Sequence, residues 1–397
     1  RTTPQSLKLI EEYKQSNPNG IVIAGGMDAS YRTYKWLESG ADIVVMGEGE
    51  RTFSELMARL EKREELDGLE GIAFRDSEGH IKVNDRRRLM SEDELSQLPL
   101  PFYDKDTRKN VNVWAVEQER GCPFACEFCL VTQTYGRTLR NKSPESVVKE
   151  VRRLRNIKDV PVFFTGDNLA GNPRYAIGML NALREAGLYR GYGTAQVSVS
   201  AAKKPELLQA MRDVGIRSLC VGFESINDKS LDEMGKPFTS EENTEAARIF
   251  HDYGFWIHGM MMLGSDSDTP ETARATGEWA KNHLDSLQLF ILTPLRGTPY
   301  WDRMHKKGRI ISDELSLNDG QHCQIQPRHF SPYKLQKTAF NIYKDFYSVK
   351  EIGKRLFRSP VPKFSLGLGL WARATGLKKI IENPQTREYM EFLKEFE

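Results

Sequence analysis

The 397-residue chain lacks long apolar runs, a large charge imbalance and a set of paired cysteines. No apolar run approaches the roughly 18 to 20 residues that span a bilayer. The opening Arg1–Pro4 has no apolar core behind it, as a signal peptide would. A net charge of +2 gives no reason to expect a nucleic acid or an acidic partner. We therefore expect a cytoplasmic protein, attached to a membrane surface at most.

Cysteines are few and unevenly placed. There are five, an odd number, and three of them lie within residues 122–129. A disulfide framework would be paired and spread along the chain. The tight group instead indicates a metal site in a reducing compartment. With 39% hydrophobic and 28% charged residues, the rest of the chain has an ordinary globular composition, and its length allows two or three domains.

Two short apolar runs near the N-terminus each end in glycine. Residues 20–24 lead into a Gly-Gly pair and residues 41–46 into Gly-Glu-Gly-Glu, each followed by a helical pattern. This predicts parallel strands of a doubly wound sheet, with a small hairpin over 71–83. Two parallel strands are too few for such a sheet. We expect that the first half of this domain is missing from the sequence, or else that the domain is abbreviated.

Beyond residue 111 the pattern becomes a regular alternation of strands and helices. Strands are expected at 113–118, 160–164, 193–198, 218–222, 256–261 and 287–292. Helices are expected near 144–155, 174–186, 205–214, 241–253 and 271–281. The fold class is therefore α/β, with a partial (β/α)6 barrel whose chemistry gathers at the carboxyl ends of the strands.

The last segment is predicted to be mostly helical. Residues 344–379 hold nine Lys or Arg and two acids, and they enclose the apolar stretch 364–371. With the stiff linker Leu98–Pro101, the chain divides into three parts. They are a partial Rossmann-like domain with linker (1–102), a barrel (103–300) and a helical C-terminal region (301–397).

The cysteine group is a loop that follows the first barrel strand. Cys122, Cys126 and Cys129 form a C-x3-C-x2-C motif. Close-set thiolates can hold an iron–sulfur cubane, and three of them leave one iron open, as catalytic metal sites keep a free position. Cys220 and Cys323 cannot complete a second cluster. Two alternatives are a structural zinc site, which would need a fourth ligand, and three cysteines without metal.

This motif, with the aromatic Phe128 before its last cysteine, resembles the signature of the radical S-adenosylmethionine (SAM) superfamily. The resemblance implies that Cys122, Cys126 and Cys129 hold a [4Fe–4S] cluster whose open iron binds S-adenosylmethionine. An electron, from a donor such as flavodoxin or ferredoxin, then breaks a C–S bond. The resulting 5′-deoxyadenosyl radical abstracts hydrogen from a substrate.

Polar residues end the second and third strands. Gly166 and Asp167 lie where the superfamily has a glycine-rich turn that meets the amino group of the cofactor; the alternative is a helix-capping turn. Gln196 and Ser198 alternate and so share a face. That face is predicted to point toward ribose hydroxyls or substrate, with a solvated strand edge as the alternative.

The fourth, fifth and sixth strands end in further candidates. A carboxylate such as Glu224 is costly to bury unless it is paired. The resemblance implies that Glu224 helps hold the cofactor; the alternative is a salt bridge to Lys236 or Arg217. Met260 lies on a strand that resembles the adenine side of the superfamily, although methionines often only fill a core. Residues 292–299 resemble the exit loop of cobalamin-associated members.

The N-terminal loops resemble the last two loops of a cobalamin-binding Rossmann-like domain. Gly25, Gly26, Gly47, Glu48 and Gly49 would line the nucleotide tail, where glycine lets the backbone approach a ligand closely. The Asp-x-His-x-x-Gly motif that supplies a cobalt ligand in this class is not in the chain. Cobalamin is therefore expected from the resemblance of these loops alone.

These features lead to three hypotheses about function. The first is an enzyme that abstracts hydrogen from an unactivated carbon, methylating it with cobalamin or otherwise rearranging, cyclising or coupling. Its basic, apolar C-terminal region suggests a lipid-like substrate or peripheral membrane contact, beside the alternative of a solvated helix face. The second is methylthio transfer, which would need further cysteines and an RNA-binding barrel. The third is an electron carrier, in which protein would normally ligate every iron.

Overall fold

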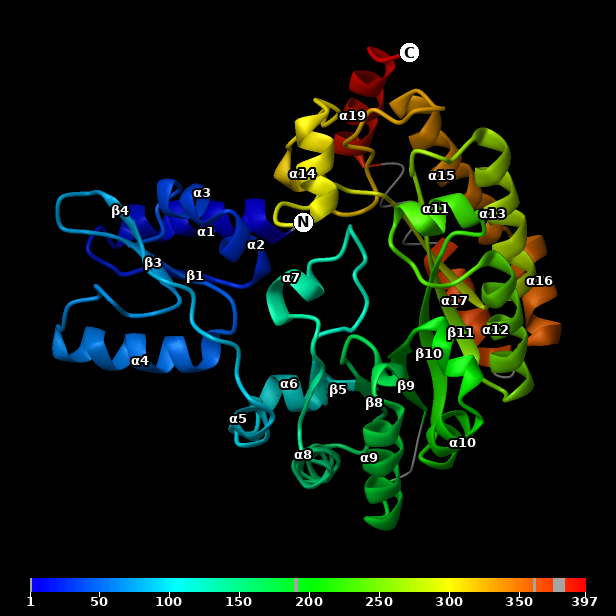
Figure 1. Cartoon of the computed structure of the whole chain (residues 1–397), viewed down its shortest axis with the longest axis horizontal. Coiled ribbons are helices and arrows are strands. Elements are labelled where there is room, and N and C mark those ends of the chain that lie inside the picture. Colours follow the sequence, from blue (N-terminus) through cyan, green and yellow to red (C-terminus); the bar gives the residue numbers. More distant parts are fainter. Residues whose placement is uncertain (1, 189–191, 360–361, 374–382) are drawn as a thin grey trace.

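A computed structural model describes the chain over residues 2–188, 192–359, 362–373 and 383–397. An N-terminal α/β domain lies beside a curved parallel sheet whose outer side carries helices, and further helices complete the C-terminal region (Figure 1). Within these described residues, no helix has the length and apolar character needed to cross a membrane. The three-part architecture agrees with the predicted fold class.

The N-terminal domain is built on a mixed sheet in the order β1-β2-β3-β4. The strands are β1 (Ile23–Gly25), β2 (Ile43–Val45), β3 (Ile72–Arg75) and β4 (Ile81–Val83). β1 and β2 are parallel, as predicted. The predicted hairpin also forms, but β3 pairs antiparallel with β2. The sheet thus has four strands rather than two, because the hairpin supplies the backbone partner for the free edge of β2.

Both faces of this sheet are covered by helices. The helices are α1 (Thr2–Ser16), α2 (Met27–Tyr31), α3 (Thr33–Glu38) and α4 (Gly49–Lys62). Val44 packs into one core with Trp36 of α3, whereas Ile43 and Val45 pack into a second core with Leu56 of α4. Because both faces of β2 are buried, the strand is a continuous apolar run in the sequence.

The barrel is a six-stranded sheet in the order β12-β11-β10-β9-β8-β5. Its strands are β5 (Trp114–Val116), β8 (Val162–Phe164), β9 (Gly193–Val197), β10 (Ile216–Glu224), β11 (Trp256–Leu263) and β12 (Ser286–Ile291). All neighbouring pairs are parallel. β5 and β12 remain at opposite edges, so the barrel is open, as predicted.

Helices cover the convex face of this sheet. They are α8 (Pro144–Ile157), α9 (Pro173–Glu185), α10 (Pro205–Asp213), α12 (Ser240–Asp252) and α13 (Pro270–His283). Side chains of Ser143, Asn172 and Thr269 accept backbone N–H groups at the starts of α8, α9 and α13. On β11, Ile257 and Met261 are buried against this layer. Alternate residues, among them the partly buried His258 and Met260, line the concave side.

The C-terminal region closes the β12 edge. Its helices are α14 (Pro299–Lys306), α15 (Pro332–Phe346), α16 (Val349–Arg358), α17 (Pro362–Trp371) and α19 (Pro384–Lys394). The hydroxyls of Tyr343 and Tyr347 each accept a backbone N–H and donate to a backbone carbonyl, at Leu289 and Leu287 respectively. These bonds protect the edge of the sheet. Part of the basic segment predicted from sequence, residues 360–361 and 374–379, lies outside the described residues.

Candidate functional site

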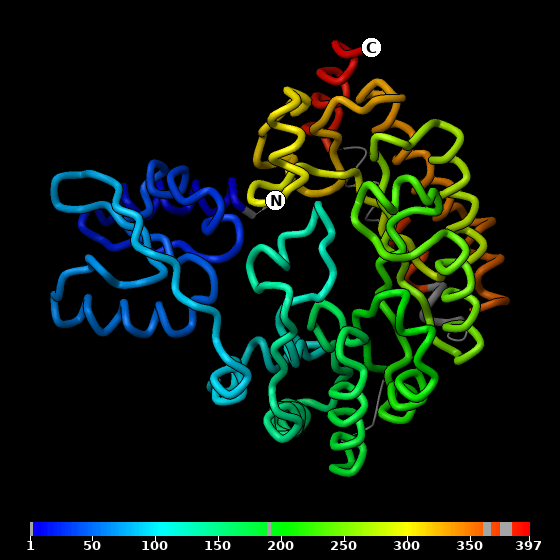
Figure 2. The backbone as a smooth tube through the Cα atoms, viewed as in Figure 1, coloured from blue at the N-terminus to red at the C-terminus, as the bar shows by residue number. Residues whose placement is uncertain are grey.

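The three clustered cysteines lie on a loop that is closed at its base. β6 (Glu119–Arg120) pairs antiparallel with β7 (Arg140–Asn141) on either side of the loop. Gly121 has a φ of 93°, and a Cβ there would lie 2.5 Å from the Thr138 carbonyl oxygen. Figure 2 shows this teal loop between the blue N-terminal domain and the green barrel strands. Strands of two residues are too short to be seen in a sequence pattern, so the analysis missed this ladder.

The thiols lie in a partly enclosed environment. Cys126 is buried, and Cys122 and Cys129 are partly buried. The Cys129 amide donates to the Cys126 carbonyl (3.1 Å), and the Val131 amide donates to the Cys129 sulfur (3.4 Å). Burial raises the pKa of all three thiols, that of Cys129 to about 11. Thiols in this state need a cationic partner before they ionise and act as ligands.

The donor set fits a cubane cluster better than a single ion. Among the residues that the structure describes, no three His, Cys, Asp or Glu side chains form the tight group that one metal ion requires. A cubane is wider, because each thiolate binds a different iron. Three thiols on one loop, with an amide aimed at one sulfur, match that demand. Cys220 lies instead on β10, and the fully buried Cys323 donates to the Ile325 carbonyl.

A buried cation stands beside these thiols. Lys236 follows α11 (Asp228–Glu233), and Gly235 brings that turn against the loop, since a Cβ there would lie 2.9 Å from the Ala125 carbonyl oxygen. The Lys236 ammonium lies 2.8 Å from Glu224 Oε1 and 5.9 Å from the centre of the Phe128 ring. Burial lowers the pKa of Lys236, but Glu224 and the thiols of Cys126 and Cys129 together hold it above its usual value.

Glu224 ends β10 in a strained backbone conformation. Its φ is 62°, in the left-handed region that residues other than glycine seldom adopt. Gly222 lies beneath the side chain, and a Cβ there would lie 2.5 Å from Glu224 Oε1 and make the carboxylate shift. The salt bridge between Glu224 and Lys236, which was the alternative predicted from the sequence, is present. Arg217 is not the partner in this pair, since its guanidinium donates to backbone carbonyls of Arg212 and Ile216.

The turn after β8 packs tightly on the start of the cysteine loop. The Gly166 amide donates to Gln118 Oε1 (3.2 Å), and a Cβ on Gly166 would lie 2.4 Å from Gln118 Nε2. Asp167 follows in a partly buried position. Burial, and then the nearby Glu117 carboxylate, raise the pKa of Asp167 to about 6. A carboxylate so placed gains from a cationic partner, such as an ammonium group.

Gln196 and Ser198, at the end of the next strand, β9, lie beside the turn that follows β8. Gln196 Nε2 donates to the carbonyls of Thr165 (3.3 Å) and Gly166 (3.4 Å). The Ser198 amide donates to Asn168 Oδ1 (3.0 Å). The structure thus brings together the predicted residues of β8 and β9. Met260, on the concave side of β11, pairs in register with Gly222 of β10.

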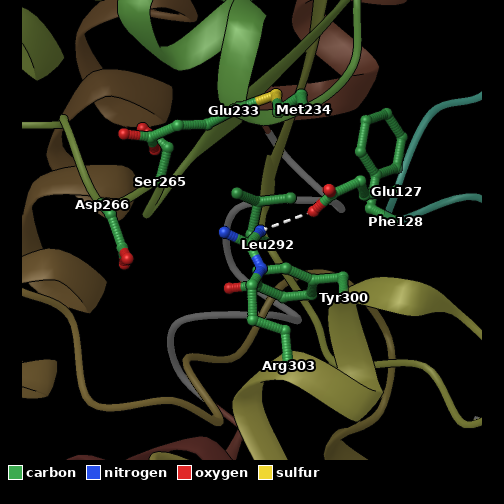
Figure 3. A pocket seen from close by; sticks show the side chains of 9 residues that line it. All are labelled: Glu127, Phe128, Glu233, Met234, Ser265, Asp266, Leu292, Tyr300 and Arg303. Carbon is green, nitrogen blue, oxygen red and sulfur yellow. Dashed lines mark ion pairs between the residues drawn. The ribbon is translucent and has the colours of Figure 1, made fainter. Parts of the chain in front are cut away.

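A small cavity joins the cysteine loop to the later strand ends (Figure 3). It is lined by Glu127, Phe128, Glu233, Met234, Ser265, Asp266, Leu292, Tyr300 and Arg303. Arg303 of α14 forms an ion pair with Glu127 (2.8 Å), the dashed line in Figure 3. The sequence analysis named only Phe128 and the segment beginning at Leu292, because the other residues converge through tertiary packing.

The two N-terminal glycine loops also meet. Ser30 Oγ donates to the Gly26 carbonyl (2.8 Å) and accepts the Gly47 amide (3.0 Å). Gly26 and Gly47 have φ values of 93° and 74°, and no atom lies within 4 Å of a Cβ built on either. Gly25 ends β1 and Gly49 begins α4. These loops therefore present backbone to open space at one edge of the sheet.

Glu48, between these glycines, is fully engaged by protein donors. Its side chain is 3% exposed and lies 3.1 Å from Arg120 Nη1 and 2.9 Å from Arg140 Nη1. The Met90 amide also donates to it (2.7 Å). Arg120 further pairs with Glu50 and with Glu117. This network joins the N-terminal domain to the base of the cysteine loop. The sequence analysis did not find it, because its partners are far apart in the chain.

Comparison with known proteins agrees with this geometry. Residues 119–280 match the model of the Radical SAM superfamily. The match begins at β6 and covers the cysteine loop and the strands from β8 to β11. Residues 119–280 of the chain therefore carry a radical SAM domain. The fold of the chain, its N-terminal α/β domain included, is similar to that of a cobalamin-dependent radical enzyme.

Individual proteins of known sequence or structure show both similarities. An uncharacterised methyltransferase from Pyrococcus horikoshii is 28% identical over 84% of this chain and 74% of its own length. The hopanoid C-2 methylase of Rhodopseudomonas palustris is 31% identical over 56% of this chain and 43% of its own length. The structure of the cobalamin-dependent S-adenosylmethionine radical enzyme OxsB has a TM-score of 0.71 at 16% identity, covering 99% of this chain and 65% of OxsB. The chain thus spans less than two thirds of the hopanoid methylase and of OxsB.

Proposed function

We propose that this chain is a radical SAM enzyme in which Cys122, Cys126 and Cys129 hold a [4Fe–4S] cluster with one open iron. The observation that carries the proposal is the closed loop of three thiols at the barrel mouth, beside the buried Lys236. When bound, the reduced cluster supplies the electron that cleaves S-adenosylmethionine to methionine and a 5′-deoxyadenosyl radical. The positive charge of Lys236 favours the ionised thiols that a cluster needs.

The surrounding residues are proposed to hold S-adenosylmethionine. Asp167, with a pKa near 6, is mostly ionised at neutral pH and can accept the amino group of the cofactor beside Gly166. Gln196 and Ser198 lie next to that turn, on the side proposed for the ribose. Glu224 is the second carboxylate of this edge.

The adenine side is proposed to include Phe128 and Met260. Phe128 lines the cavity of Figure 3 and lies beneath the Lys236 ammonium. Met260 is partly buried on the concave face. Both residues offer apolar surface to a purine ring, and neither competes for its polar edge. The barrel interior would thereby exclude water from the radical.

The reaction is proposed to be hydrogen abstraction from an unactivated carbon, followed by C-methylation when cobalamin is present. The open backbone at Gly26 and Gly47, with Gly25 and Gly49 near them in the chain, supports a cofactor in the N-terminal domain. Glu48 is proposed to hold the loops of this cofactor site in place without touching the cofactor. Its oxygens already accept hydrogen bonds from protein donors. The methyltransferase relatives support methylation, with rearrangement or C–C bond formation as the remaining reactions of this class.

The substrate is proposed to be a small molecule, lipid-like by analogy with the hopanoid methylase. A flavodoxin or ferredoxin is the proposed electron donor, in the cytoplasm or at the membrane surface. We also propose that residues 1–102, 103–300 and 301–397 form the cofactor domain, the barrel and the helical region. These boundaries keep each of the three sheets of the described residues within one part.

Formation of 5′-deoxyadenosine tests the proposal. The protein is reconstituted anaerobically with iron and sulfide, reduced with dithionite and given S-adenosylmethionine. We expect the wild type and a Cys323→Ser control to form 5′-deoxyadenosine, and Cys126→Ala to form none. Cys323 is the matched control because it is a buried cysteine outside the loop and its hydrogen bond to the Ile325 carbonyl survives in serine. A fully loaded wild type without product would instead support an electron carrier.

A further inference from the structure

Helix α16 exposes two parallel stripes of side chains. Residues four apart lie along one side of a helix. Val349 and Phe357, with Gly353 between them, form an apolar stripe in which Val349 is 64% and Phe357 95% exposed. Lys350, Lys354 and Arg358 form a stripe of cations beside it, and all three are exposed. Among the residues that the structure describes, Phe357 therefore buries almost none of its ring.

The exposed side of α16 carries no acid. Glu351 lies on the buried side and is bonded to Lys354 (2.8 Å). Arg358 fixes the end of the helix to the barrel, because its guanidinium donates to the carbonyls of Lys281, Asn282 and Leu284. The stripes are therefore held in a defined position on the body of the protein.

Helix α17 packs against α16 and ends in two further exposed apolar residues. A Cβ on Gly369 would lie 3.1 Å from the Ile352 side chain, so the two helices are in close contact. Leu370 is 47% and Trp371 61% exposed. Figure 1 shows α16 and α17 next to each other at the side of the molecule away from the N-terminal domain. We call the exposed residues Val349, Lys350, Lys354, Phe357, Leu370 and Trp371 the α16–α17 face.

We propose that the α16–α17 face binds an anionic lipid surface. Helices that lie in a membrane interface combine apolar and aromatic side chains with neighbouring Lys or Arg, and each such cation gains from anionic headgroups. The charge of the face is complementary to such a surface. This inference extends the proposed function to lipid-associated substrates. Vesicle binding needs neither the cluster nor S-adenosylmethionine, so its failure is separate from failure of the radical chemistry.

Sedimentation with vesicles tests the proposal. The chain is mixed at low salt with vesicles of phosphatidylcholine, alone or blended with phosphatidylglycerol. We expect binding to the blended vesicles only. Phe357→Ser should weaken it about tenfold, from lost burial of the ring, and Lys350→Gln/Lys354→Gln by about tenfold or more. Phe102→Ser, which removes another exposed phenylalanine (79%), is the matched control and should bind as the wild type does.

Three outcomes would overturn the proposal. One is a wild type that does not sediment with the blended vesicles. Another is retention on heparin that depends on the lysines but not on Phe357, which would show a general polyanion site. The third is a dimer in analytical ultracentrifugation that Phe357→Ser abolishes, which would assign the face to a second copy of the chain. Circular dichroism checks that each variant is folded, as these exposed positions lead us to expect.

Discussion

Glu48 and Glu224 invite comparison, because each lies at or just after the end of a parallel strand in its own sheet. Both side chains are buried, at 3% and 8% exposure, and both are paired with cations. Glu48 nevertheless pairs with two arginines and also accepts a hydrogen bond from a backbone amide. For Glu224, the ion pair with Lys236 is the one such contact found among the described residues.

The difference teaches how to interpret a buried carboxylate. A strand end marks the functional edge of both sheets, but the number of protein donors decides what the side chain does there. A carboxylate whose oxygens are saturated with protein donors, such as Glu48, holds two parts of the fold together. Glu224 has acceptor capacity left and is held in a strained backbone beside Lys236, which is why we propose it as a ligand contact.

The largest expected effect is on stability at the saturated site. Glu48→Ala should lower the free energy of unfolding by about 3 kcal/mol, because Arg120 and Arg140 would remain buried without their shared partner. Urea titration followed by tryptophan fluorescence measures this. Glu55→Ala removes a half-exposed carboxylate that also pairs with two arginines, and should cost under about 1 kcal/mol. Equal stability of the two variants would remove the distinction between the two glutamates.

The second expected effect is on S-adenosylmethionine binding at Glu224, which has fewer protein donors than Glu48. Glu224→Gln in the cluster-loaded protein should weaken S-adenosylmethionine binding about tenfold, or about 1.4 kcal/mol, measured by anaerobic equilibrium dialysis. Glu150→Gln is the matched control, since the Lys142–Glu150 pair is as buried as the Lys236–Glu224 pair but lies away from the thiols. If both variants bind alike, Glu224 is a structural partner of Lys236 and nothing more.

A third change concerns the cation shared by Glu224 and the thiols. Lys236→Met should lower the reduction potential of the cluster, since a nearby positive charge favours the added electron. A difference of about 1 kcal/mol in the free energy of reduction is expected for a partly screened charge. A redox titration followed by electron paramagnetic resonance measures it. An unchanged potential would show that Lys236 does not act on the cluster.

The smallest effect is a pH dependence at Asp167. Its pKa of about 6 means that the carboxylate gains a proton as the pH falls through that value. S-adenosylmethionine binding should therefore weaken about twofold between pH 7.5 and pH 6, and Asp167→Asn should flatten this dependence at a lower affinity. An Asp167→Asn variant with the pH profile of the wild type would assign the titration to another group.

Local patterns in the sequence predicted most of the fold. The six barrel strands alternate with helices that, apart from α10, begin at Ser, Thr or Asn caps, and these signals are contained within each segment. The predicted ends of the strands were less accurate than the predicted order of strands and helices. β10 continues to Glu224, past the apolar run, because its backbone ladder persists through a buried carboxylate. β5 ends at Val116, because the chain then turns to pair Glu119 with Asn141 of β7.

The candidate site was predictable only in part. The cysteine spacing is local, and so are the glycine turns. The sequence analysis named Lys236 as a partner for Glu224 but gave no sign that it also lies beside the thiols. Arg140 joins Glu48 across more than ninety positions, and no pattern along the chain reports such a contact. Long-range ion pairs arise from packing between domains.

The open iron is the central claim, and electron paramagnetic resonance of the reduced cluster tests it most directly. The protein is reconstituted to about four irons per chain and its spectrum is recorded before and after S-adenosylmethionine is added. The account predicts that the cofactor changes the spectrum of the wild type, because it binds the iron that no cysteine holds. An identical spectrum in a fully loaded protein would show a closed cluster and contradict the account.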